Sequence, residues 1–294
     1  MSKIGICTIT YNQRHCAPDV VSNLRELEGD DCAFFVRDDC STDGTFEYFH
    51  AAKLQNLHLQ GNEKRLGSRK NSIELYSSVD TAYMVCKGGD DLVYAPTVRK
   101  ALSIIDRLNP DLIICKAAYV GFQIALELSK TENLSSVIKD SVVKNKIVFD
   151  RSWPSLEELL AASATLPGML WNQGLLIRTE LAQEAGFLPD GEVDDWGHLH
   201  NLAVLARQKK LKVFYLDEIL TIIGQVSDSL GGDPIRQMYR QLHAIEHFWH
   251  EDFKKQAFCN ALLKKISGFA VSDASYSQIR AGISESLESS KYYS

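Results

Sequence analysis

Short apolar runs alternate with longer amphipathic stretches over the first 120 residues of the chain. The short runs are typical of buried strands and span residues 4–9, 33–36, 57–59, 83–86 and 112–115. The stretches between them carry apolar residues at helical spacing. Strands and helices that alternate in this way are joined by right-handed crossovers. We therefore predict an α/β fold with a mainly parallel sheet.

The alternation is less regular in the rest of the 294-residue chain. We predict further elements at residues 156–160, 170–177, 180–185 and 214–223, and one long helix or two at residues 235–266. The longest uncharged apolar run, residues 117–126, is predicted to be a core strand. It is shorter than the ~18 residues that a membrane-spanning helix needs, so we expect no such helix.

Charge and cysteine content narrow the function classes. The formal net charge is −6, which argues against a generally basic surface and hence against nucleic acid as a partner. Seven cysteines are scattered without a C-x-x-C pair, which indicates reduced thiols in a cytoplasmic protein rather than a disulfide or zinc framework. The first residues lead directly into a predicted strand, so we expect no signal peptide.

Polar clusters follow three of the predicted strands. They are Thr10-Tyr11-Asn12, Asp38-Asp39 and Asp90-Asp91. Ligands of an open parallel sheet bind outside the carboxyl ends of its strands, so these clusters should converge on one pocket. Taken singly, an acidic pair after a strand is as easily explained as a helix cap. Three such clusters at one edge favour a binding site.

The residue types in these clusters suit a nucleoside diphosphate. Adjacent carboxylates, Asp90 and Asp91, suit a hard divalent cation that also holds phosphates. Asp39 is able to accept a hydrogen bond from a base, and Tyr11 to stack on it. Neither Gly-rich phosphate-binding motif is present. The phosphates must therefore be held by the cation and by basic side chains. Three candidates stand just before a predicted helix: Arg65, Arg69 and Lys70. The alternative for them is a solvated helix face.

These motifs resemble those of the inverting family 2 glycosyltransferases, which have the A-type glycosyltransferase (GT-A) fold. The resemblance rests on residues 10–12, on residues 36–45 (VRDDCSTDGT) and on Gly89-Asp90-Asp91, in the family's order and spacing. A later stretch, residues 186–196, resembles the acceptor-side segment that ends in the family's catalytic acidic motif. The resemblance implies a Rossmann-like, mainly parallel sheet flanked by helices.

The resemblance also implies a division of the chain. Residues 1–230 would form the catalytic domain, with a nucleotide-sugar half at residues 1–120 and an acceptor half at residues 121–230. Residues 231–294 would form a helical extension. Its basic, aromatic and amphipathic pattern fits either a peripheral membrane contact or packing on the catalytic domain or a second subunit.

The same resemblance implies a role for each matching residue. Asp91 would coordinate Mn²⁺ or Mg²⁺, Asp90 would contact the ribose, and Asp195 would be the general base, supported by Asp194. For Asp194-Asp195 the alternative is an acidic helix start. The remaining residues would bind the nucleotide-sugar: Ile9, Thr10, Tyr11 and Asp39 at the base, and Arg65 and Lys70 near the diphosphate.

Four positions depart from the family pattern. Ile9 stands where the family usually has a proline, Gly88 where it often has a first aspartate, Lys70 where arginine is common, and Gln225 where many members have a histidine. The implied activity is transfer of a sugar, expected from a UDP-sugar, to a glycan or a lipid-linked glycan. A catalytically silent module that binds nucleotides or glycans remains the alternative. A nucleotidyltransferase is disfavoured because its Gly-rich N-terminal loop is missing.

Overall fold

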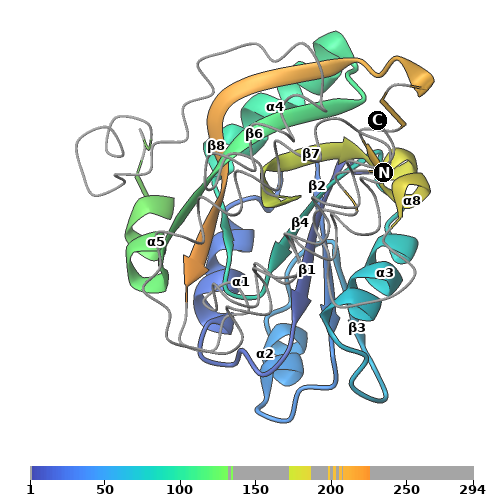
Figure 1. Ribbon diagram of the computed structural model, residues 1–294. Coiled ribbons are helices and arrows are strands. Elements are labelled where there is room, and N and C mark those ends of the chain that lie inside the picture. Colours follow the sequence, from blue (N-terminus) through green and yellow to red (C-terminus); the bar gives the residue numbers. More distant parts are fainter. Residues whose placement is uncertain are drawn as a thin grey trace, which may run out of the picture.

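The computed structural model describes residues 2–131, 134, 172–186, 198, 201–202, 205–206 and 208–225. The described strands form one eight-stranded sheet in the order β3-β2-β1-β4-β7-β6-β8-β5 (Figure 1). Their bounds are β1 Ile4–Thr10, β2 Cys32–Asp38, β3 Leu57–Gly61, β4 Tyr83–Gly88, β5 Leu92–Val93, β6 Leu112–Gly121, β7 Leu175–Arg178 and β8 Val213–Gln225. The α/β prediction is confirmed.

Strand direction divides the sheet into two parts. Strands β3, β2, β1 and β4 pair parallel, as the alternation predicted. Beyond β4 the sheet is mixed, because β7 runs antiparallel to both β4 and β6, and β5 runs antiparallel to β8. β6 and β8 pair parallel, with a register shift near Lys116. Segments from residues 175–225 therefore complete the sheet that the first 121 residues begin.

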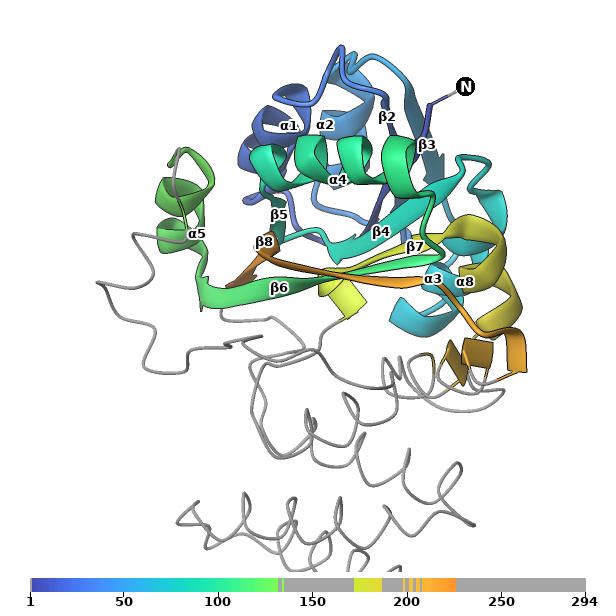
Figure 2. The same cartoon turned by 90° about the horizontal axis from the view of Figure 1, so that it is seen from above.

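Helices cover both faces of this sheet. They are α1 Ala17–Arg25, α2 Thr45–Ala51, α3 Ser68–Ser78, α4 Ala95–Leu108, α5 Phe122–Ser129 and α8 Thr179–Ala185, with a short 3₁₀ turn, η1, at Asn172–Gly174. One hydrophobic cluster joins α1, α2, α4 and α5 to the sheet, and a second joins α3 and α8 to its other face. Figure 2 shows α1, α2 and α4 on one side and α3 and α8 on the other.

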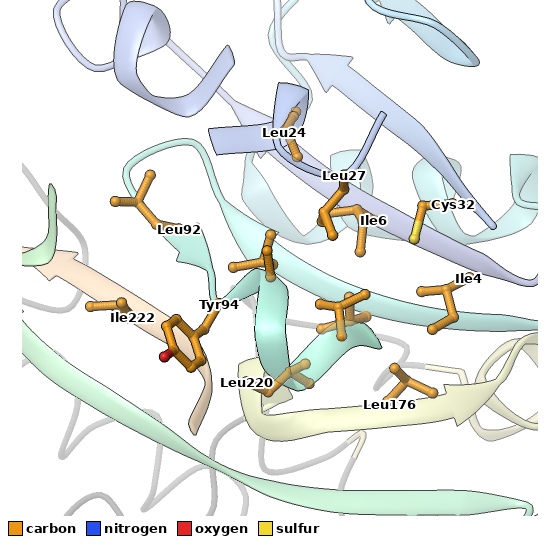
Figure 3. Packing of buried hydrophobic residues seen from close by; sticks show 14 of the residues in the cluster. Ile4, Ile6, Leu24, Leu27, Cys32, Leu92, Tyr94, Leu176, Leu220 and Ile222 are labelled. Atoms are coloured by element: carbon orange, nitrogen blue, oxygen red, sulfur yellow. The ribbon is translucent and has the colours of Figure 1, made fainter. Parts of the chain in front are cut away.

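The larger cluster forms from alternate residues of the central strands. Ile4 and Ile6 of β1 point to the same face as Leu24 and Leu27, and Leu220 of β8 reaches this cluster from the far end of the chain (Figure 3). All of these side chains are buried. Period-2 alternation places the neighbouring residue, Cys7, on the α3 side. The core therefore fixes which face every strand residue presents.

The predicted strand at residues 117–126 was wrong in its second half. β6 ends at Gly121 and α5 begins at Phe122. An apolar run alone does not separate a buried strand from a buried helix, and this run contains both. Within the described ranges, no helix is long and apolar enough to cross a membrane. The predicted elements at 156–160 and 235–266, and the extension at 231–294, lie outside the described residues.

Candidate active site

The carboxyl ends of β1, β2 and β4 meet in register at one edge of the sheet. Thr10 pairs with Asp38 across β1 and β2, and Ile9 pairs with Gly88 across β1 and β4. The Asp39 N–H donates to the Thr10 carbonyl at 2.9 Å and continues the alignment past the strand ends. The three polar clusters that the sequence singled out are therefore brought together.

Hydrogen bonds tie the loop after β1 to the loop after β2. The backbone N–H groups of residues 12, 13 and 14 donate to side-chain oxygens of Ser41, Thr45 and Asp43 at 2.8–2.9 Å. In return, the Thr42 N–H donates to Asn12 Oδ1 at 2.9 Å. Asp43 also accepts from the N–H of Thr45, the first residue of α2, at 3.0 Å. The stretch before α2 therefore also holds the neighbouring loop.

Asp38 and Asp39 are adjacent but have different partners. Asp38 accepts from the backbone N–H and the hydroxyl of Ser41, at 2.7 and 2.5 Å, and so caps the turn after β2. Burial raises the pKa of Asp38, and the Ser41 hydrogen bonds oppose that rise. Asp38 is therefore a structural cap, the plainer of the two explanations for an acidic pair.

Asp39 holds the loop that leads into α3. Its Oδ1 accepts from Asn62 Nδ2 at 2.9 Å and from the Leu66 N–H at 2.7 Å, while Oδ2 accepts from the Gly67 N–H at 2.8 Å. An ionised carboxylate has about four acceptor positions. Three are used within the protein, which leaves one for a ligand N–H. Asp39 is only 3% exposed, so its carboxylate is held in place by these three hydrogen bonds rather than by water.

Tyr11 and Arg65 come together above this loop. The Arg65 guanidinium carbon lies 4.2 Å from the centroid of the Tyr11 ring, a cation–π contact. Arg65 is exposed, and so is Lys70 in the first turn of α3. Both basic side chains therefore stand at the rim of the same edge.

Ile9 and Thr10 offer mainly backbone to this edge. Ile9 packs partly buried on the α3 side of the sheet. The Thr10 side chain is buried, and its hydroxyl donates to Gln13 Oε1 at 3.1 Å. A ligand at this edge would meet their peptide groups rather than their side chains.

Asp90 and Asp91 lie in a tight turn between β4 and β5. The Asp91 N–H donates to the Gly88 carbonyl at 3.3 Å, while Asp91 Oδ2 accepts from the Gly88 N–H at 2.7 Å. Both residues are buried, at 7% and 3% exposure. Burial raises the pKa of Asp91, and the negative charge of Asp90 raises it further. The turn thus concentrates negative charge where little water reaches it.

The atoms around Gly88 show whether Asp90 and Asp91 fit a divalent cation. A Cβ built on Gly88 would lie 2.8 Å from Asp90 Oδ1 and 3.1 Å from Asp91 Oδ2, so the two carboxylates flank one small cradle. Hard oxygen ligands of this kind suit Mg²⁺ and Mn²⁺. No group of three or more His, Cys, Asp or Glu side chains forms within the described ranges. The donor set fits the cation, with ligand phosphates and water needed to complete its shell.

Strand β8 closes the site from the far end of the sequence. The Gly224 N–H donates to Asp91 Oδ1 at 3.2 Å, across 133 positions of the chain. A Cβ on Gly224 would lie 2.2 Å from the Asp90 carbonyl oxygen, so only glycine allows this approach. Gln225, which follows it, was identified from the sequence as standing in place of a histidine. The fold therefore brings this backbone position beside the carboxylate turn.

Lys87 is a part of the site that sequence reasoning missed. It is 1% exposed, and its ammonium donates to the carbonyls of Gly88 and Asp91. Burial lowers its pKa, and the charge of Asp91 opposes that change. A lysine inside an otherwise apolar strand, one residue before a Gly-Gly-Asp-Asp turn, was the available signal. Asp194 and Asp195, the predicted base motif, lie outside the described residues.

Comparison with solved structures identifies the fold. Residues 1–349 of S. aureus TarS in complex with UDP-GlcNAc match with a TM-score of 0.66 and 16% identity, over 98% of this chain and 81% of that one. The mannosyltransferase PcManGT from Pyrobaculum calidifontis, in complex with GDP-Man and Mn²⁺, matches with a TM-score of 0.54 and 14% identity, over 99% and 86%. The fold is that of the A-type glycosyltransferases.

The family follows from a match over the first half of the sequence. The model of Glycosyl transferase family 2 matches residues 5–150, about half of the chain. This chain therefore carries a glycosyltransferase domain of family 2, and the resemblance stated from its motifs is confirmed. M. tuberculosis glucosyl-3-phosphoglycerate synthase is a further match, with a TM-score of 0.53 and 13% identity over 86% of this chain and 82% of that one. A search of curated proteins gave no significant match.

Proposed function

We propose that this protein transfers a sugar from a nucleotide-sugar, with UDP as the preferred carrier, to an acceptor hydroxyl with inversion at the anomeric carbon. The observation that carries the proposal is the in-register convergence of three strand ends in a family 2 domain. It gathers an acceptor carboxylate (Asp39), an aromatic ring with a guanidinium on it, and a carboxylate pair at one edge.

The base preference rests on the acceptor capacity of Asp39. Uracil presents a ring N–H, and the one free acceptor position of Asp39 suits it. Tyr11 is available to stack on the base, with Arg65 moving toward the diphosphate. Thymine and guanine also present ring N–H groups, so dTDP and GDP are the competitors. The similar solved structures include complexes with UDP-GlcNAc and with GDP-Man, which supports a nucleotide-sugar donor without choosing the base.

The reaction needs a base and a stabilised leaving group. We assign Asp195 as the general base that removes the acceptor hydroxyl proton, with Asp194 in support. Asp91 would hold Mn²⁺ or Mg²⁺ together with the diphosphate, and Asp90 beside it would contact the ribose. When bound, this cation neutralises charge that develops on the leaving nucleoside diphosphate. Arg65 and Lys70 add positive charge at the rim, and the peptide groups of residues 9–10 orient the base.

The acceptor and setting are proposed from the family alone. A glycan or lipid-linked glycan, used in bacterial surface polysaccharide or glycoconjugate synthesis, is the expected acceptor. The six cysteines of the described ranges are all free thiols, which suits the cytoplasm. Peripheral membrane contact or self-association through residues 231–294 would bring the enzyme to such an acceptor.

One observation favours a second function. Gly88 removes a carboxylate that the family often has, which would suit a catalytically silent module that still binds nucleotides or glycans. Calorimetry with UDP, dTDP and GDP, each with and without Mn²⁺, tests the donor. Turnover assays with a panel of sugar nucleotides separate the enzyme from the silent module. Tighter binding of GDP than of UDP would overturn the base preference, and binding without any turnover would favour the module.

A further inference from the structure

Lys87 is a buried ammonium next to the carboxylate turn, and no role above uses it. Lysine is almost never fully buried without partners, because its charge loses hydration. Here Nζ donates to the Asp91 carbonyl at 2.9 Å and to the Gly88 carbonyl at 3.2 Å. These two residues are the first and last of the 88–91 turn. The ammonium therefore bridges the base of the turn from inside the protein.

Three further hydrogen bonds of the turn involve Gly88 or Asp91. The Asp91 N–H donates to the Gly88 carbonyl, the Gly88 N–H donates to Asp91 Oδ2, and the Gly224 N–H donates to Asp91 Oδ1. At 3.3 Å, the backbone bond across the turn is longer than usual. Lys87 adds a 2.9 Å bond from β4 to the Asp91 carbonyl, beside the 2.7 Å bond from the Gly88 N–H to Asp91 Oδ2.

The surroundings of Lys87 are polar in an otherwise apolar layer. Thr8 pairs with Lys87 in the β1–β4 register, so the two side chains lie on the same face of the sheet. Thr8 is fully buried, and its hydroxyl has no hydrogen-bond partner among the described residues. The ionisable groups whose charges act on Lys87 are Asp91, Asp90, Cys86 and Cys16. A buried ammonium thus lies beside the turn that carries the two carboxylates.

We propose that Lys87 is a positioning residue of the donor site, which holds the 88–91 turn from within and offsets part of the charge of Asp90 and Asp91. In this role it keeps both carboxylates around the cradle over Gly88 before a cation-bound nucleoside diphosphate arrives. Groups that orient a metal's ligands without touching the metal typically contribute about 10- to 100-fold to metal affinity. The proposal rests on the proposed donor site.

The test compares Lys87→Met with Lys3→Met. Lys3 precedes β1 at the opposite end of the sheet, and its side chain is 40% exposed in ion pairs with Asp31 and Asp106. Binding of UDP with Mn²⁺ is measured by calorimetry on the full chain. We expect Lys87→Met to weaken it about 10- to 100-fold, while Lys3→Met binds like wild type. In turnover assays the loss should appear in KM for the donor more than in kcat.

Amide hydrogen exchange gives a readout that needs no ligand. Lys87→Met should exchange faster at residues 88–91 while the rest of β4 stays protected. Wild-type affinity together with wild-type exchange in Lys87→Met would refute the proposal. If wild type binds neither UDP, dTDP nor GDP, the proposed function fails, and the exchange comparison still decides whether Lys87 holds the turn.

A measurement on wild type covers the case in which Lys87→Met does not fold. In protein labelled with ¹⁵N at lysine side chains, the buried Lys87 ammonium should give a slowly exchanging signal. Adding UDP with Mn²⁺ should broaden this signal through the nearby paramagnetic ion and leave the Lys3 signal sharp. A Lys87 signal that stays sharp at saturating UDP and Mn²⁺ would place the cation elsewhere and overturn the proposal.

Discussion

Asp38 and Asp39 are adjacent at the end of β2 but hold different parts of the structure. Asp38 turns back onto Ser41 and caps the turn, whereas Asp39 turns toward the next loop and holds Leu66 and Gly67. The two carboxylates of this pair therefore hold different segments and share none of these hydrogen-bond donors. Of the two, Asp39 is the one that we propose for contact with the base.

Gly88→Ala should impair donor binding more than folding. Gly88 is not among the residues with positive φ, so alanine is compatible with its backbone. The added Cβ would meet Asp90 Oδ1 at 2.8 Å, and this carboxylate would have to move. We expect binding of UDP with Mn²⁺ to weaken roughly tenfold or more, with unfolding free energy changed by less than about 1 kcal/mol. Calorimetry and chemical denaturation measure the two; unchanged affinity would show that the cradle is not used.

The predicted base motif separates donor binding from transfer. Asp195→Asn should leave UDP binding nearly intact and lower the rate of transfer by about 10²–10⁴-fold, because the acceptor hydroxyl loses its base. Asp194→Asn should cost less. Single-turnover assays with both variants decide the register: the reverse order would make Asp194 the base. Full activity in both, with the fold intact, would mean that the motif only starts a helix.

At the scale of elements, the sequence predicted what local pattern determines. The strands and helices from β1 to α4 carry their own periodicity, and Pro96 and Asn109 mark the start and end of α4. β5 escaped prediction because two residues have no period. The antiparallel insertion of β7 between β4 and β6 escaped it because strand neighbours are chosen by tertiary packing, which no local run of residues encodes.

The site follows the same rule. The motifs predict ligand-binding roles for Asp39 and Asp91, since their types and positions after strands are visible in the sequence. The donors that hold these carboxylates are backbone N–H groups of Leu66, Gly67 and Gly224, and any residue type carries such a group. No sequence pattern could reveal them. Lys87 could have been noticed, since a charged residue in a buried strand is rare.

Gly224→Ala should destabilise the junction of β8 with the carboxylate turn. The added Cβ would lie 2.2 Å from the Asp90 carbonyl oxygen and 2.6 Å from Phe122 Cδ2, so backbone must shift. We expect a loss of about 1–3 kcal/mol in unfolding free energy. Gly121→Ala is the matched control, because Gly121 pairs with the next residue of β8 and a Cβ there meets open space. Equal stability of the two variants, measured by denaturant titration, would contradict the predicted contact.

For the whole molecule, the donor and its cation should act as a stabiliser. A ligand that binds only the folded state at about 100 times its Kd adds roughly 2.7 kcal/mol of stability. UDP with Mn²⁺ should therefore raise Tm, and excess EDTA should remove the rise because no phosphate loop replaces the cation. Asp91→Ala should show no metal-dependent rise. Thermal unfolding followed by circular dichroism measures this; an undiminished rise in EDTA would exclude a cation from donor binding.

The hydrogen bond from Gly224 to Asp91 also has a consequence for folding during translation. The ribosome makes the chain from its N-terminus, at about 5–20 residues per second, so some 7–27 s separate the appearance of Asp91 from that of Gly224. These two residues are 133 positions apart. β4 has no β7 beside it until residues 175–178 are made, and β5 has no β8 until residues 213–225 are made. The nascent chain thus carries an open strand edge, which is a template for aggregation, until residues 213–225 have been translated.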